Sequence, residues 1–160
     1  MSDDWVTEYI EIHKQREREK QDVQTRRSLA TSQAPGKFQW IRERMKRDVR
    51  MFRGVVRFQA LELQEYPSDK FQVIHPLSPR VILEIELTQI LIKYLYAFFP
   101  KDDSGGRPEQ KIGTLRICSD LDGLLTVYED GSKEKLGKKL ADESEVSEFL
   151  LKPVLDYIDG

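Results

Sequence analysis

The sequence is poor in the features that most often reveal a catalytic or cofactor site. Cys118 is the single cysteine in 160 residues, so no intrachain disulfide can form and no pair of cysteines can anchor a structural zinc ion. The chain also lacks a Gly-x-Ser-x-Gly nucleophile motif, a His-Glu-x-x-His zinc motif and a Gly-Lys-Ser/Thr phosphate-binding loop. We therefore expect a protein of a reducing compartment that needs no cofactor.

Long apolar runs are missing as well. The most apolar stretch, residues 81–99, approaches the length of a membrane span but contains Glu84, Glu86 and Lys93. Because each charge at the centre of a bilayer costs about 2.5–3.5 kcal/mol, we expect this stretch to be a buried element of a domain. The first residues show neither a basic start nor an apolar run, which argues against a secretory signal. The sequence thus predicts a cytoplasmic protein with no membrane partner.

Charge, by contrast, is abundant and unevenly distributed. Asp, Glu, Lys and Arg make up 34% of the residues, more than the roughly 25% of typical globular domains. Residues 1–57 hold 14 Lys and Arg against 9 Asp and Glu, a net +5, whereas residues 58–160 hold 12 against 19, a net −7. The N-terminal third is therefore basic and the remainder is acidic.

The N-terminal segment is expected to form a helical arm. Trp5, Tyr9 and Ile12 recur at i, i+4 and i+7, which places them on one stripe of a helix. Residues 13–22, however, contain no large apolar side chain, and a helix that is polar all round persists only through ion pairs, solvent bridging or a partner. We expect this arm to be disordered, or exchanged between subunits, unless another surface binds it.

A linker is expected to follow the arm. Residues 28–36 are small and polar and end in Pro35-Gly36, a composition typical of a connection between structured segments. The predicted organisation is a charged helical arm with its linker over residues 1–34 and an α+β domain over residues 35–160.

Two helices of the domain are predicted by apolar side chains at helical spacing. The first covers residues 37–52 and the second lies at the C-terminus, where Asp142 and Glu145 have capping-box spacing. Pro153 is expected to kink or interrupt the C-terminal helix. The apolar positions are Ile41, Met45, Val49 and Phe52 in the first helix, and Val146, Phe149, Leu150, Val154, Tyr157 and Ile158 in the second.

Between these helices we expect a sheet of about five or six strands. Strand-like composition or alternation occurs in residues 55–63, 71–75, 81–88, 114–118 and 124–128. The last two segments flank an Asp122-Gly123 step, which predicts a hairpin. Residues 89–99 fit either a strand or a helix, and their many β-branched and aromatic residues favour a strand. Consecutive strands favour an antiparallel sheet packed by the second helix and the C-terminal helix.

One segment partly matches a calcium-binding loop. Asp120, Asp122, Gly123 and Glu129 have the required spacing, but Cys118 stands where the first carboxylate ligand belongs. Calcium prefers six to eight oxygen ligands, so an ordinary Asp-Gly hairpin is the simpler interpretation.

Two further residues have reactive side chains without a complete site. His75 ends a predicted strand, and no companion residue identifies it as a general base. Arg116 could lower the pKa of the Cys118 thiol, but a lone cysteine without a histidine partner is more often structural. Neither residue predicts catalysis.

The favoured hypothesis is therefore a non-catalytic protein–protein interaction or assembly module. Trp5, Tyr9 and Ile12 are the expected anchors, because aromatic side chains contribute large contact energies in a partner's pocket. We expect the protein to form homo-oligomers through the N-terminal arm.

Two other functions remain open. Basic side chains of the second helix could track a nucleic-acid backbone, although Glu43 and Asp48 lie among them and make intrahelical ion pairs an equal explanation. The chain could also be an enzyme whose site is assembled only in three dimensions. The nucleic-acid hypothesis depends on Arg42, Arg44, Lys46, Arg47 and Arg50.

Overall fold

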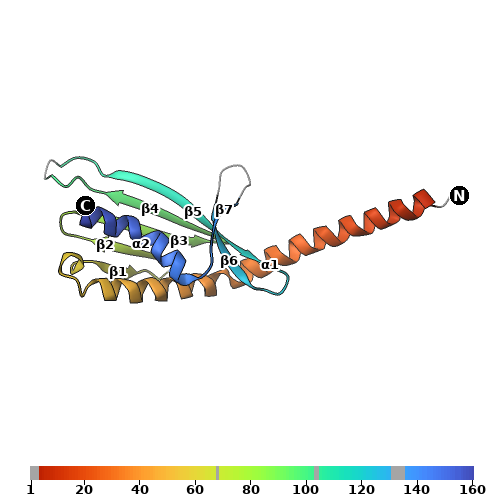
Figure 1. Ribbon diagram of the computed structural model, residues 1–160, viewed down its shortest axis with the longest axis horizontal. Helices are drawn as coiled ribbons and strands as arrows, with labels where there is room; N and C mark the ends of the chain where they lie inside the picture. Colours follow the sequence, from red (N-terminus) through yellow and green to blue (C-terminus); the bar gives the residue numbers. More distant parts are fainter. Residues whose placement is uncertain (1–3, 68, 103–104, 131–135) are drawn as a thin grey trace.

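A seven-stranded antiparallel sheet, covered on one face by two helices, forms the body of the protein, and the first helix extends well beyond it (Figure 1). The computed structural model describes residues 4–67, 69–102, 105–130 and 136–160. The predicted α+β fold is confirmed, but the sheet has seven strands instead of five or six. The elements are α1 (Asp4–Phe52), a short 3-10 helix (Val56–Phe58), β1 (Glu62–Glu65), β2 (Lys70–His75), β3 (Val81–Thr88), β4 (Leu91–Phe98), β5 (Glu109–Ser119), β6 (Leu125–Asp130), β7 (Leu136–Leu140) and α2 (Glu143–Asp159).

The sheet is a meander in which each strand pairs with the next one in sequence. Successive side chains of a strand point to opposite faces, so Phe71 and Val73 of β2 and Leu83 and Ile85 of β3 face the helices, all with 0% exposure. Side chains on the other face, such as Glu84, remain partly exposed. One face of the sheet thus forms a single hydrophobic core with α1 and α2.

Helix α1 is uninterrupted over 49 residues, a length of about 73 Å. Residues 28–36 are helical and contain Pro35 inside the helix, so the prediction of a linker is wrong. A proline in a helix interior costs about 3 kcal/mol, but Ala30 and Ala34 are buried at 2% and 0% exposure, and α1 contacts β5 and β6. The small side chains allow a close approach to the sheet, and this burial offsets the cost of the proline.

Three details of the strands differ from, or extend, the expectations. Residues 56–58, expected in a strand, form a 3-10 helix, and β1 begins only at Glu62. Residues 91–98 form β4, which confirms the strand interpretation of that stretch, and Gln89, with a φ of 57°, lies in the tight turn after β3. Strand β7 is not predicted, because Leu-Gly-Lys-Lys-Leu contains no β-branched or aromatic residue.

The expected hairpin and helix cap are both present. β5 and β6 pair as neighbours, and Gly123 between them has a φ of 88°, which favours glycine. The Asp142 carboxylate accepts a 2.9 Å hydrogen bond from the Glu145 amide at the start of α2, as the capping-box spacing predicts. Helix α2 nevertheless continues through Pro153, so the proline does not end it.

Tyr96 of β4 ties the sheet to α2. Its side chain is 1% exposed, and its hydroxyl donates a 2.6 Å hydrogen bond to the carbonyl oxygen of Leu150. Burial raises the pKa of Tyr96, so the hydroxyl keeps the proton that it donates. A buried hydroxyl and a helix carbonyl thereby satisfy each other.

Replacing Tyr96 with Phe should lower the free energy of unfolding by about 1–3 kcal/mol, because the Leu150 carbonyl oxygen loses its buried donor. Urea denaturation measures this change. Tyr66→Phe is the matched control, since the Tyr66 hydroxyl donates to Gln72 at the surface, and we expect a change below about 0.5 kcal/mol there. Equal losses in the two variants would contradict the assigned role of Tyr96.

Candidate functional site

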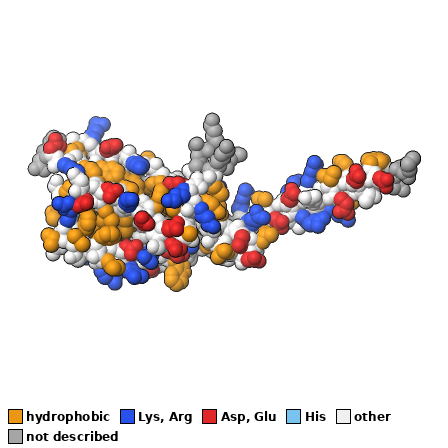
Figure 2. All heavy atoms as spheres, in the orientation of Figure 1, with side chains coloured by type: hydrophobic (Ala, Val, Ile, Leu, Met, Phe, Trp, Pro, Cys, Tyr) orange, Lys and Arg blue, Asp and Glu red, His pale blue; other side chains and the backbone are white. Residues whose placement is uncertain are grey.

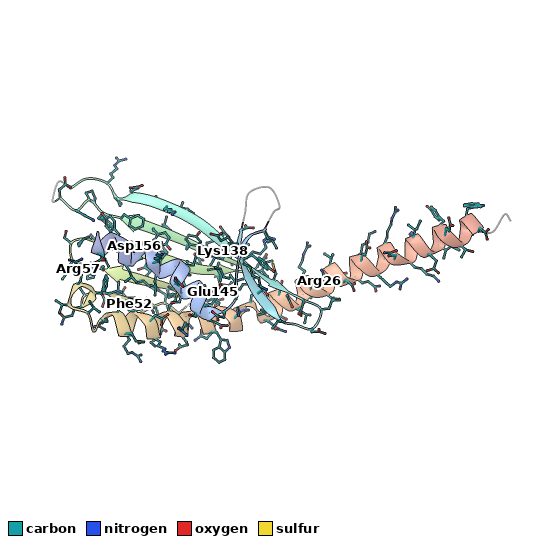
Figure 3. The ribbon with its side chains drawn as sticks, viewed as in Figure 1. Arg26, Phe52, Arg57, Lys138, Glu145 and Asp156 are labelled. Carbon is teal, nitrogen blue, oxygen red and sulfur yellow. The ribbon has the colours of Figure 1, made fainter. Side chains whose placement is uncertain are left out.

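Residues 4–28 of α1 form an arm, most of which stands clear of the sheet and of α2 (Figure 1), and Arg26 near its base lies beside the β5–β6 hairpin. Trp5, Tyr9 and Ile12, the predicted anchors, are 66%, 67% and 49% exposed. Figure 3 places Arg26 where the helix leaves the body. The structure therefore brings the three anchors together on one exposed segment.

The anchors lie on the side of α1 that packs against the sheet further along the helix. An α-helix makes one turn in about 3.6 residues, so Ile12 and Val23 are about three turns apart, and Val23 and Ala30 about two. Ala30 is buried, whereas Val23 is 52% exposed. The apolar side chains of the tip thus lie on the side of α1 that the sheet covers in the body, but the polar residues 13–22 separate the two apolar segments.

Charge separates the arm into two parts. Residues 4–13, here called the arm tip, contain Asp4, Glu8 and Glu11 and no Lys or Arg, whereas residues 14–28 contain six Lys and Arg against three Asp and Glu. Among the described residues, the single ion pair of the arm joins Lys20 and Glu17 at 3.9 Å. No helix of the described chain is apolar enough over a sufficient length to cross a membrane. The tip carries exposed apolar side chains, including Val6 and Ile10 away from the anchors, and is acidic overall (Figure 2).

A second candidate surface is a groove between the C-terminal part of α1 and α2, with a volume of about 640 Å³. We call it the α1–α2 groove. Its apolar lining consists of Met51, Phe52, Val55, Leu151 and Leu155. Met51 and Val55 are 66% and 51% exposed, and Figure 2 shows hydrophobic side chains gathered on the face that carries α2. The body thus presents an open, largely apolar groove, and Figure 3 places Phe52, one of its lining residues, towards the end of the body opposite the arm.

Polar contacts connect α1 and the 3-10 helix that follows it to α2 on either side of the groove. Lys37 lies 2.7 Å from Glu143 at the start of α2, and Arg57 pairs with Asp159 at its end. Between them, Asp48 accepts hydrogen bonds from Arg44 and from the hydroxyl of Ser147, the latter at 2.7 Å. These contacts join α1 and the 3-10 helix to both ends of α2, and the groove lies between them.

Some of the basic residues on which the nucleic-acid hypothesis depends form ion pairs within the chain, and others do not. Arg42 and Lys46 lie 3.8 and 3.5 Å from the Glu65 carboxylate of β1, and Arg44 pairs with Asp48. Arg47 and Arg50 are exposed, and neither forms an ion pair with another described residue. Three of the five cations are thus partly neutralised within the chain, and nucleic-acid binding stays a prediction.

The residues with reactive side chains do not converge. His75 is buried on the helix-covered face, and its Nδ1 atom lies 2.8 Å from the carbonyl oxygen of Pro79. Arg116 and Cys118 alternate with the buried Leu115 and Ile117, so they lie on the other face of the sheet. Burial raises the pKa of the Cys118 thiol more than Arg116 lowers it, which contradicts an activated cysteine.

The calcium-like segment is a hairpin turn. The Asp120 carboxylate accepts hydrogen bonds from the amides of Asp122 and Leu124 at 2.9 and 2.8 Å, which closes the turn. In the described part of the chain, no three His, Cys, Asp or Glu side chains are grouped so that they could hold a metal. Asp120 therefore has a structural role.

Sequence reasoning missed the α1–α2 groove. Phe52 was recognised as part of an apolar stripe, but Met51 and Val55 fall outside it, and α2 lies about a hundred residues further along the chain. The apolar pair Met51 and Val55, four residues apart next to a basic helix, was a weak signal for a second apolar surface.

The contact between Lys37 and Glu143 should make stability depend on acidity. The hydrogen bond from Lys37 lowers the pKa of Glu143 from its ordinary value of 4.5. A lowered folded-state pKa contributes stability above the unfolded value, and this contribution disappears as the pH falls through the folded value. Lys37→Met should therefore be less stable than wild type at neutral pH, with a smaller difference below pH 4.5.

Urea denaturation at neutral and acidic pH measures this difference. Lys14→Met is the control, because Lys14 lies on the exposed arm and its loss should leave stability unchanged at both pH values. A deficit of Lys37→Met that is equal at both pH values would contradict the assigned ion pair.

No protein-family model matches the chain, and neither a curated protein nor a solved structure matches it. The function proposed below therefore depends on the geometry of this chain.

Proposed function

We propose that the protein is an assembly module that binds a second copy of itself through the arm tip, residues 4–13. The exposure of Trp5, Tyr9 and Ile12 on one side of a helix that stands clear of the body carries this proposal. Large aromatic side chains are enriched at protein interfaces, because burying them in a partner contributes strongly to binding.

Helix energetics support a binding role for the arm. Helix nucleation is unfavourable and propagation is nearly neutral, so most helices in proteins depend on the packing of an apolar face. The segment from Ala30 to Val49 buries one side of α1, whereas no residue of the arm, 4–28, is buried. Binding of the tip would supply the packing that the arm lacks.

The negative charge of the arm tip favours a protein partner over a nucleic acid. The tip carries Asp4, Glu8 and Glu11 without a compensating Lys or Arg, and phosphate groups repel carboxylates. The basic part of the arm, residues 14–28, is interleaved with Glu17, Glu19 and Asp22. An apolar or basic protein surface therefore suits the tip better than a polyanion does.

Ile12→Ser should weaken self-association by about tenfold or more, because a buried isoleucine contributes about 1.5–3 kcal/mol and 1.4 kcal/mol corresponds to a tenfold change. Ile10→Ser is the matched control: its isoleucine is 47% exposed against 49% for Ile12, but lies about 160° away around the helix axis. Sedimentation equilibrium of the full-length chain, whose monomer mass is 18.8 kDa, measures both variants.

We expect wild type and Ile10→Ser to show concentration-dependent masses above that of the monomer. A wild-type chain that stays monomeric at every concentration, or equal masses for Ile12→Ser and wild type, would remove the arm tip as a self-association element.

A further inference from the structure

The arm tip and the α1–α2 groove are complementary, and we infer that the tip of one copy docks in the α1–α2 groove of a second copy. This inference rests on the proposed function and specifies the surface that receives the tip. Both surfaces are apolar and exposed in the single chain: Trp5 and Tyr9 on the tip, Met51 and Val55 in the groove. A helix laid into an apolar groove is a common mode of recognition.

The two surfaces match in length. Trp5 and Ile12 are about 10 Å apart along the helix axis, and the wall of the groove from Arg44 to Phe52 is about 12 Å long, at a rise of 1.5 Å per residue. The anchors of the tip therefore span the floor of the groove without reaching beyond it.

The arm tip and the border of the α1–α2 groove also have charges of opposite sign. The tip holds three acidic residues and no Lys or Arg. Residues 42–53, the part of α1 that borders the groove, hold six Lys and Arg against Glu43 and Asp48, and Asp48 is already occupied by Arg44 and Ser147. Arg47 and Lys152 line the groove without an ion pair to another described residue. Glu148 also lines the groove, so its lining holds three cations against two carboxylates, and the acidic tip meets a rim with a small excess of positive charge.

The tip cannot reach the groove of its own chain. Trp5 and Met51 belong to one continuous helix, and 46 residues of helix hold them about 70 Å apart. Docking therefore requires a second molecule.

The same geometry favours a reciprocal pair. Ile12 and Asp48 are separated by about ten helical turns, so Ile12 lies on the side of α1 that carries the Asp48 edge of the groove, and Met51 lies about 60° further round the helix. Two α1 helices running antiparallel can then each present a tip to the other's groove. One docked tip buries roughly 150–250 Å² for each aromatic side chain, less than the roughly 800 Å² per partner of a standard interface. Two reciprocal contacts double that area, so we expect a dimer.

Groove variants test the receiving surface. Met51→Glu and Val55→Glu each place a carboxylate at an exposed position that faces the acidic tip, and each should weaken self-association of the full-length chain about tenfold or more. Val56→Glu is the matched control: the adjacent valine is 86% exposed and does not line the groove. It should stay within about twofold of wild type. Thermal denaturation confirms that each variant is folded.

Mixing two defective chains tests the pairing of the surfaces. A double variant, Met51→Glu with Val55→Glu, keeps an intact tip, and Ile12→Ser keeps an intact groove. Each alone should be mainly monomeric, whereas an equimolar mixture retains one of the two contacts and should show a weight-average mass above that of either variant alone and below that of wild type. Recovery in the mixture distinguishes tip-to-groove docking from pairing of two arms.

The outcomes separate this inference from the proposed function. If Ile12→Ser weakens association while Met51→Glu and Val55→Glu behave as wild type, the tip binds elsewhere, and tip-to-groove docking is overturned although the assembly function stands. If Val56→Glu weakens association as much as Val55→Glu does, the groove is not the specific receptor. If Ile12→Ser has no effect, the proposed function itself fails.

Discussion

The structure depends on the burial of one side of α1 against the sheet. Ala34, Phe38, Ile41 and Met45 are 0–1% exposed, and their contact with the strands fixes the position of the helix under the meander. Because helix propagation costs little once a turn is formed, this buried segment also sets the direction of the arm. The core and the exposed tip therefore belong to one continuous helix, and the position of the buried segment sets the direction of the tip.

Much of the body could be predicted from the sequence, because local patterns and burial agree there. Ile41, Met45 and Val49 have helical spacing and are buried, and residues 81–88 alternate as a half-buried strand requires. The prediction failed where tertiary packing overrides local preference. Pro35-Gly36 is typical of a linker, yet Ala30 and Ala34 pack closely against the sheet and keep the segment helical.

The two candidate surfaces, the arm tip and the α1–α2 groove, also differ in whether the sequence could predict them. The arm could be predicted, because its anchors recur at helical spacing within a few residues of one another, and a polar continuation leaves them without a core. The groove could not, since it forms only where Phe52 and Leu151, 99 residues apart, are brought together by the contacts of Lys37 and Asp48 with α2. Apolar periodicity in a sequence predicts which face of a single helix is apolar. A groove is formed by two helices, so it can be predicted only when their packing is known.

Because α1 is continuous, the exposed apolar side chains of the arm tip cannot fold back onto the body of the same chain. A flexible linker at residues 28–36 would let the tip fold back and bury Trp5 and Tyr9 on its own body, which would compete with binding in trans. The continuous helix removes that alternative, so the exposure of the tip is relieved only by another molecule. The apolar stripe of the arm is also short, and the small area that it can bury favours reversible association over a permanent assembly. In the proposed assembly, the continuous helix would make the binding intermolecular, and the polar composition of residues 13–22 would limit the area buried and so favour reversibility.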